Sequence, residues 1–208
     1  MKKLLFTSLF ACLFGAFLSA QFSDATLLFT DGTKKEGFAD IPDNPYDGSI
    51  KFKSSIDGKL EIIPSKLISS VKYVTKIGET LIFERLRIAN IHVKKDGTVK
   101  LKLENKDSWL FLASNHQKLN YYKFARGYDI DKKGQFYFIY SQGSFSPTTP
   151  FFKKPSEINA IGLYAPLTNI LRNLKGYFKD APHLVKKIEN NEIDWYDSDK
   201  LYKEYISY

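Results

Sequence analysis

The spacing of apolar residues changes character along this chain. Between residues 24 and 140 they form short runs or alternate with polar residues, and segment 99–103 alternates strictly between valine or leucine and lysine. Such alternation is typical of a strand with one face in water. Turn-forming pairs such as Asp96-Gly97 separate the runs. About ten short strands at this spacing predict an antiparallel β sandwich, a roll or a partly closed barrel over residues 21–142.

A different pattern follows. Residues 143–155 contain Gly143 and three prolines among serines and threonines, which predicts a loop or linker. Residues 156–208 show helical spacing, and we expect a small helical C-terminal unit. Its clearest apolar stripe consists of Leu167, Ile170, Leu171, Leu174 and Phe178. Residues 158–165 fit either a helix or a strand, and the whole chain is expected to belong to the α+β class.

Two further helices have recognisable start signals. Asp180 can cap the first, with Pro182 in its first turn, where a missing N–H has no cost. Asp197 or Ser198 can cap the second. These positions place both helices within the C-terminal unit.

The first twenty residues have the three-part pattern of a secretory signal peptide. The basic pair Lys2-Lys3 precedes an uncharged apolar run at 4–18, and Ser19-Ala20 offers small residues for cleavage. A membrane anchor is the alternative, but the run is shorter than the ~20 residues that span a bilayer. We therefore expect an exported protein that is periplasmic, associated with the outer membrane or secreted.

Composition excludes several classes of protein. Apolar residues make up 43% of the 208 residues and aromatic residues 15%, which is too much for a disordered chain. The single cysteine, Cys12, lies within the predicted signal peptide, so the exported chain would carry no thiol. No later apolar run approaches 18 residues, and no transmembrane helix is expected after processing.

The formal net charge is +8, and part of the basic excess occurs as lysine doublets beside predicted turns. If the hairpins point the same way, three doublets would form one contact surface for an anionic membrane. Their residues are Lys34, Lys35, Lys94, Lys95, Lys132 and Lys133. The alternative role of these lysines is solubility and protection of sheet edges. An unknown envelope protein or an anionic membrane surface is thus the expected partner, and export argues against nucleic acid.

No catalytic or cofactor motif is visible. The three histidines lack metal-ligand spacing, and the chain has no Gly-x-Ser-x-Gly elbow, phosphate loop or Rossmann glycine pattern. We expect no cofactor and no metal site, and an enzyme is possible but not favoured. The ten aromatic residues between 109 and 140 could line a ligand pocket, although core packing explains them as well.

The C-terminal segment resembles a known group of sequences. Tyr177-Phe178-Lys179-Asp180-Ala181-Pro182 and the helical pattern after it are similar to a Tyr-Phe-x-Asp-Cys-Pro-x-Leu stretch in uncharacterised secreted proteins of Bacteroidetes-type bacteria. The Leu-Ser-Ala-Gln cleavage region and Phe83-Glu84-Arg85-Leu86-Arg87 look similar too. Ala181 stands where that family often has cysteine, so no thiol role carries over. The resemblance implies placement in the envelope or secretion, and no activity.

These patterns favour a non-enzymatic interaction or structural protein of the bacterial envelope. The first alternative is a β-barrel or sandwich module that binds an apolar ligand or a glycan. The second is an unrecognised hydrolase. A deep pocket lined by tyrosine and phenylalanine would favour the binding module. Converging carboxylates or a Ser–His contact would favour the enzyme.

Overall fold

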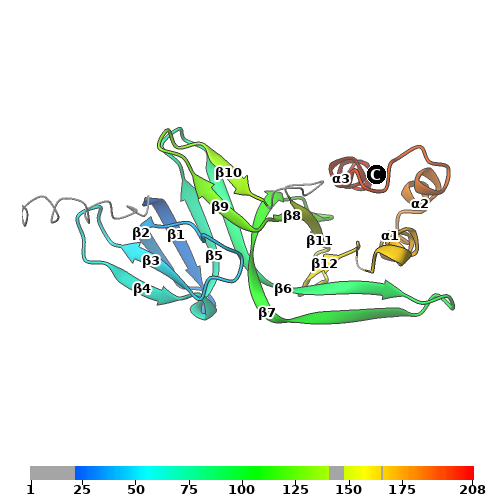
Figure 1. The fold of residues 1–208 in the computed structure, drawn as a ribbon, viewed down its shortest axis with the longest axis horizontal. Helices are drawn as coiled ribbons and strands as arrows, with labels where there is room; N and C mark the ends of the chain where they lie inside the picture. The colour runs from blue at the N-terminus through cyan, green and yellow to red at the C-terminus, as the bar shows by residue number, and fades with distance from the viewer. Residues whose placement is uncertain (1–21, 141–147, 165) are drawn as a thin grey trace, which may run out of the picture.

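A computed structural model describes residues 22–140, 148–164 and 166–208 (Figure 1). The predicted signal peptide of residues 1–20 lies outside this range. The described residues form twelve strands, three α-helices and two short 3-10 helices, which confirms the α+β class. The strands are β1 (Ser23–Phe29), β2 (Lys34–Ala39), β3 (Ser49–Lys53), β4 (Glu61–Pro64), β5 (Ile68–Val74), β6 (Thr80–Val93), β7 (Val99–Ser114), β8 (Asn120–Phe124), β9 (Gly127–Ile130), β10 (Phe136–Ile139), β11 (Thr149–Lys153) and β12 (Ala160–Gly162). The helices are η1 (Ser65–Leu67), η2 (Leu167–Asn169), α1 (Ile170–Tyr177), α2 (Pro182–Glu189) and α3 (Ser198–Ile206).

Five strands close into a barrel-like ring. The order β6-β7-β8-β11-β12 is antiparallel throughout, and β12 then pairs in parallel with residues 88–90 of β6. Leu110, Tyr122 and Phe151 fill the interior of the ring together with Ile88 and Ala160. The partly closed barrel is therefore the member of the three predicted β architectures that occurs here.

The other half of the sheet forms a second lobe. Strands β5, β1, β2, β3 and β4 extend from β6 in that order, and the β9–β10 hairpin packs on them. The ring of Phe83 lies 4.9 Å from that of Tyr128 on the hairpin. Trp109 is completely buried there and donates from Nε1 to Ser65 Oγ. Since Leu110 faces the ring interior, both faces of this part of β7 are covered, as the continuous apolar run 109–112 predicts.

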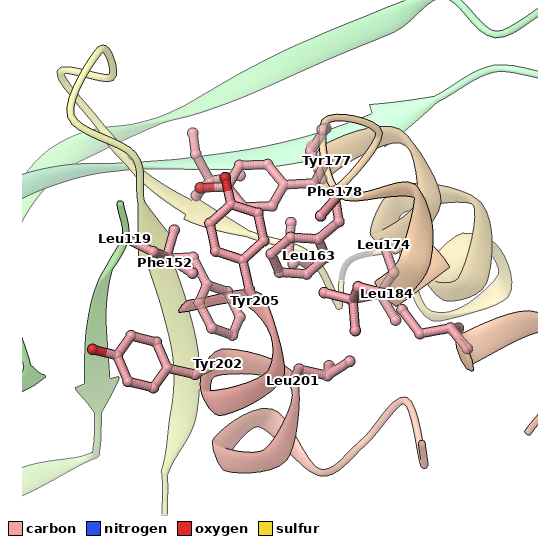
Figure 2. Close-up of a cluster of buried hydrophobic side chains, with 14 of the residues drawn as sticks. Leu119, Phe152, Leu163, Leu174, Tyr177, Phe178, Leu184, Leu201, Tyr202 and Tyr205 are labelled. Atoms are coloured by element: carbon pink, nitrogen blue, oxygen red, sulfur yellow. The ribbon is translucent and has the colours of Figure 1, made fainter. Parts of the chain in front are cut away.

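The helices cover the outer face of the ring. Figure 2 shows Leu174, Phe178, Leu184 and Leu201 converging on Phe152 of β11. The side chain of Leu167 lies outside the described part, and among the other four positions the predicted helical stripe is wrong at Leu171, which is 50% exposed while Asn173 is buried in its place. The helix begins at Ile170, and the turn before it is 3-10, which shifts the buried face.

Helix starts follow the expected chemistry in part. Asp197 caps α3 by accepting a hydrogen bond from Lys200 N, and Pro182 occupies the first turn of α2. Asp180 does not cap α2, because its carboxylate accepts hydrogen bonds from Lys154 and Tyr205 instead. None of the helices in the described residues combines the length and apolar character needed to cross a bilayer.

One segment differs from the sequence expectation, and in a second the structure decides between the two alternatives left open. The expected loop 143–155 contains strand β11, which pairs with β8, while residues 143–147 lie outside the described range. Segment 158–165 contains strand β12 and no helix in its described residues. Both strands belong to the ring, so the sheet continues into the part of the chain expected to be linker and helical unit.

Strands β6 and β7 are also far longer than the short runs predicted. The charged segments in their middle stay in the sheet because they pair across it, as Arg87 Nε does with Asp107 Oδ1 at 2.5 Å. A register shift between Arg87 and Ala89 accommodates these residues. The result is one long hairpin that reaches beyond the ring (Figure 1).

Candidate binding surface on the β6–β7 arm

The end of the β6–β7 hairpin projects from the ring. Residues 91–103 are called the arm from here on, and within the described chain their strand residues pair only inside the β6–β7 hairpin. The turn closes with hydrogen bonds from Gly97 N to Lys94 O and from Lys94 N to Thr98 O. Gly97 has φ +83°, which glycine adopts without strain, so Asp96-Gly97 makes the turn that the sequence predicts. Figure 1 places this turn at the opposite end of the molecule from the β1–β4 lobe.

One hydrogen bond fixes which backbone groups of the arm point outward. Val93 N donates to Asn173 Oδ1 at 3.0 Å and not to β7. Val93 is paired with Val99, so theirs is a non-hydrogen-bonded pair of the ladder. Such pairs alternate with hydrogen-bonded ones, so Ile91–Leu101 and Ala89–Leu103 are of the same kind. Val99, Leu101 and Leu103 therefore direct their N–H and C=O groups away from β6.

The outer edge of β6 is sealed. Strand β12 pairs with residues 88–90 of this edge. Beyond them the edge is covered by completely buried Asn173, whose Oδ1 accepts from Val93 N and whose Nδ2 donates to Leu163 O. Helix α1 lies so close that a Cβ atom at Gly176 would be 2.5 Å from Val93 Cγ2. A side-chain amide and a glycine contact thus replace a neighbouring strand.

The outer edge of β7 is bare over the same stretch. No described strand pairs with it along residues 99–103. The side chains of Val99, Leu101 and Leu103 are 43%, 52% and 52% exposed. The sequence predicts that one face of this hairpin is exposed to water. The apolar face is partly exposed as well, because the helices cover Ile91 and Val93 of β6 but not the apolar side chains of β7.

The opposite face of the arm is polar and cationic. Lys100 and Lys102 line a groove of about 600 Å³ with His92, Glu104 and Pro166 among its other walls. None of the four arm lysines takes part in an ion pair within the described residues. With Asp96 as its single carboxylate, the arm has a formal net charge of +3.

The acidic groups nearest to these lysines are occupied. Asp96 accepts a hydrogen bond from Thr98 N at 2.9 Å, and this bond lowers the pKa of its carboxyl. Glu104 Oε1 accepts from Asn90 Nδ2 at 3.1 Å. The arm therefore offers unpaired positive charge beside an open apolar strand.

The structure does not bring the three predicted lysine doublets together. Lys132 and Lys133 lie in the β9–β10 turn, where a Cβ atom at Gly134 would be 2.9 Å from the side chain of Lys76 in the β5–β6 turn. Lys94 and Lys95 lie at the other end of β6, about 45 Å away at ~3.3 Å per residue.

The third doublet occupies yet another place. Lys34 pairs with Leu28, which also pairs with Ser70 near the start of β5. Lys35 Nζ makes an ion pair with Glu61 at 2.6 Å. The six lysines therefore lie at three separate sites and share no common face toward a membrane.

The aromatic series from 109 to 140 is mainly core. Trp109, Tyr121, Tyr122 and Tyr128 are all at most 2% exposed. Phe136 and Phe138 pack on the cluster that contains Trp109 and Tyr128. Within the described residues no group of three or more His, Cys, Asp or Glu is placed to hold a metal ion.

A group of titratable side chains surrounds Lys154, the residue after β11. Lys154 Nζ donates to Asp180 Oδ1 and to Tyr177 O, both at 2.7 Å. Tyr205 Oη donates to Asp180 Oδ2, and Tyr177 Oη donates to Glu157 Oε2, both at 2.8 Å. These bonds tie the sheet to α1 and α3.

The pKa shifts in this group follow from burial and from these bonds. Burial, followed by the neighbouring carboxylate, raises the pKa of both Tyr177 and Tyr205. Burial would raise the pKa of Asp180, but the hydrogen bonds from Lys154 and Tyr205 outweigh it, and the pKa is lowered. A neutral tyrosine pair around an ionised Lys–Asp pair is a stable clamp between the helices and the sheet.

Sequence reasoning missed Asn173 and the bare edge of β7. The alternation of 99–103 is visible in the sequence, but it does not reveal which edge lacks a neighbour. The predicted resemblance to secreted proteins of Bacteroidetes-type bacteria remains a prediction. No protein-family model matches this chain, and no curated protein or solved structure is significantly similar to it.

Proposed function

We propose that this chain is an exported, non-enzymatic interaction protein of the bacterial envelope, and that the arm is its contact surface. The observation that carries the proposal is the bare edge of β7 with its exposed residues Val99, Leu101 and Leu103. Proteins normally shorten, cover or twist away such edges, because they pair with other chains. Here the neighbouring edge of the same hairpin is sealed, so the open edge offers a defined place for a partner.

The export part of the proposal rests on residues 1–20. A basic pair, an uncharged apolar run and a small-residue site together are typical of a signal peptide. Intact-mass measurement of the protein recovered from the envelope or medium should show a chain that begins at Gln21. Retention of Met1, or a lipid on Cys12, would contradict this assignment.

The interaction part can be tested by site-specific photocrosslinking in cells. A photoreactive amino acid at Leu101 should give a discrete adduct with an envelope component. The same amino acid at Ile158, which is 86% exposed, is the matched control for a surface position outside the arm. An adduct from Leu101 that disappears when Lys100 and Lys102 are both changed to Glu would support contact through the arm. Equal adducts from both positions would contradict it.

A further inference from the structure

We infer that β7 binds an extended, acidic segment of a partner protein by strand addition. This inference rests on the proposed function and adds the binding mode and the chemistry of the partner. The site consists of the outer edge of β7 at residues 99–103 and the lysines on the same strand.

The backbone provides the docking line. Val99, Leu101 and Leu103 each turn one N–H and one C=O outward, and no described residue accepts or donates there. Three residues at alternate positions cover about 14 Å at ~3.4 Å per residue. This matches the ladder of an added strand of five or six residues.

The side chains define what the added strand contains. On one face it would lie beside exposed Val99, Leu101 and Leu103, and on the other beside Lys100 and Lys102, which have no ion-pair partner among the described residues. Neighbouring strands place directly opposed side chains on the same face. The complementary segment therefore alternates apolar and acidic residues.

The same charges argue against a second copy of this chain. Two β7 strands related by a twofold axis would pair antiparallel, with each side chain on the same face as its partner. An arrangement centred on Leu101 would set Lys100 directly against Lys102 of the other copy. Like charges opposed in this way are destabilising. In this register, lysine on the open edge favours an acidic partner over self-association.

The test uses the whole chain and a synthetic eight-residue peptide that alternates valine and glutamate. Labelled peptide should bind in a fluorescence anisotropy titration at low salt, and binding should weaken as salt rises. Amide chemical-shift changes should concentrate at residues 99–103. A peptide with lysine in place of glutamate and a peptide with N-methylated backbone amides are the two controls, and both should bind at least tenfold more weakly.

Charge reversal provides the sharper test. The double variant Lys100→Glu/Lys102→Glu should bind the glutamate peptide at least tenfold more weakly than the wild type does. It should bind the lysine peptide more tightly than the wild type does. The matched control Lys132→Glu/Lys133→Glu changes the same charge in the β9–β10 turn and should leave binding unchanged. Leu101→Pro removes an outward N–H that β6 does not use, so the fold should persist while binding is lost.

Several results would overturn the inference. They are equal binding of the glutamate, lysine and N-methylated peptides, unchanged binding by the charge-reversed arm, and shift changes located away from residues 99–103. An adduct from Leu101 in cells combined with no binding of the glutamate peptide would refute strand addition while leaving the proposed function intact. Absence of both would refute the two together.

Discussion

The two outer edges of the β6–β7 arm belong to one hairpin, but the edge of β6 is covered and the edge of β7 is open. On β6 the outward N–H of Val93 reaches completely buried Asn173, and β12 covers the residues before it. On β7 the corresponding outward groups of Val99 and Leu101 have no partner in the described chain. The difference shows that strand pattern alone does not decide exposure. A neighbour supplied about 80 residues later in the chain decides it.

The largest effect should come from the helix that seals β6. Leu174→Asp should destabilise the protein by about 4 kcal/mol, because Leu174 is completely buried and a carboxylate there has no partner. Leu171→Asp on the same helix should change stability by less than about 0.5 kcal/mol, since Leu171 is half exposed. Urea unfolding of both variants measures the difference, and similar losses would mean that α1 packs with another face.

The hydrogen bonds of Asn173 at the edge of β6 should make the next largest contribution to stability. Asn173→Leu removes the hydrogen bonds to Val93 N and Leu163 O and should cost about 3 kcal/mol, because buried groups lose their partners. Amide hydrogen exchange at Val93 should accelerate in this variant. Asn169→Leu, one turn earlier and only partly buried, is the control, and it should leave exchange at Val93 unchanged. Slow exchange at Val93 in Asn173→Leu would disprove the role given to Asn173.

A smaller effect should come from the clamp that ties the sheet to the helices. Lys154→Met should lower stability by about 2 kcal/mol, because the charge-assisted bonds to Asp180 and Tyr177 O are lost. Thermal unfolding measures this, with Lys153→Met at the last residue of β11 as the control. A loss no larger than that of the control would show that the clamp adds little.

The same clamp predicts a direction of pH dependence. The pKa of Asp180 is lowered in the folded state, so its contribution is complete above the unfolded carboxyl value of about 3.9 and is lost as pH falls through the folded value. Asp180→Asn should therefore flatten the acid limb of the stability curve. An identical acid limb in wild type and variant would refute this.

A substitution at the bare edge of β7 should cause the smallest change in stability. Leu101→Thr should alter the free energy of unfolding by less than about 0.5 kcal/mol, because Leu101 is already half exposed. Hydrogen exchange along β7 is more revealing. Amides of Val99, Leu101 and Leu103 should exchange fast, and those of Lys100 and Lys102 should be protected. Uniform protection along 99–103 would show that another part of the chain covers this edge.

Local chemistry made some of this fold predictable. The Asp197 cap, Pro182 in the first turn of α2 and the turn at Asp96-Gly97 all follow from interactions within a few residues. Burial on both faces at 109–112 follows from a continuous apolar run. These features depend little on the remainder of the chain.

Long-range pairing made the rest unpredictable. Charged residues interrupt the apolar pattern at Arg87 and Asp107, yet they pair across the hairpin and keep both strands continuous. Strand β12 has only three residues, and its role depends on a parallel partner at 88–90. The candidate surface was visible only as alternation at 99–103, because the missing neighbour is a property of the whole sheet.

Closure of the ring by β12 also sets an order of events during synthesis. Residues 88–90 cannot pair with β12 until residues 160–162 have been synthesised. The hydrogen bond of Val93 N likewise requires Asn173. Until then both edges of the β6–β7 hairpin are open to other chains, so a nascent or truncated protein is more exposed to aggregation than the finished one. The segment from β12 to α1 therefore protects a strand that is made long before it.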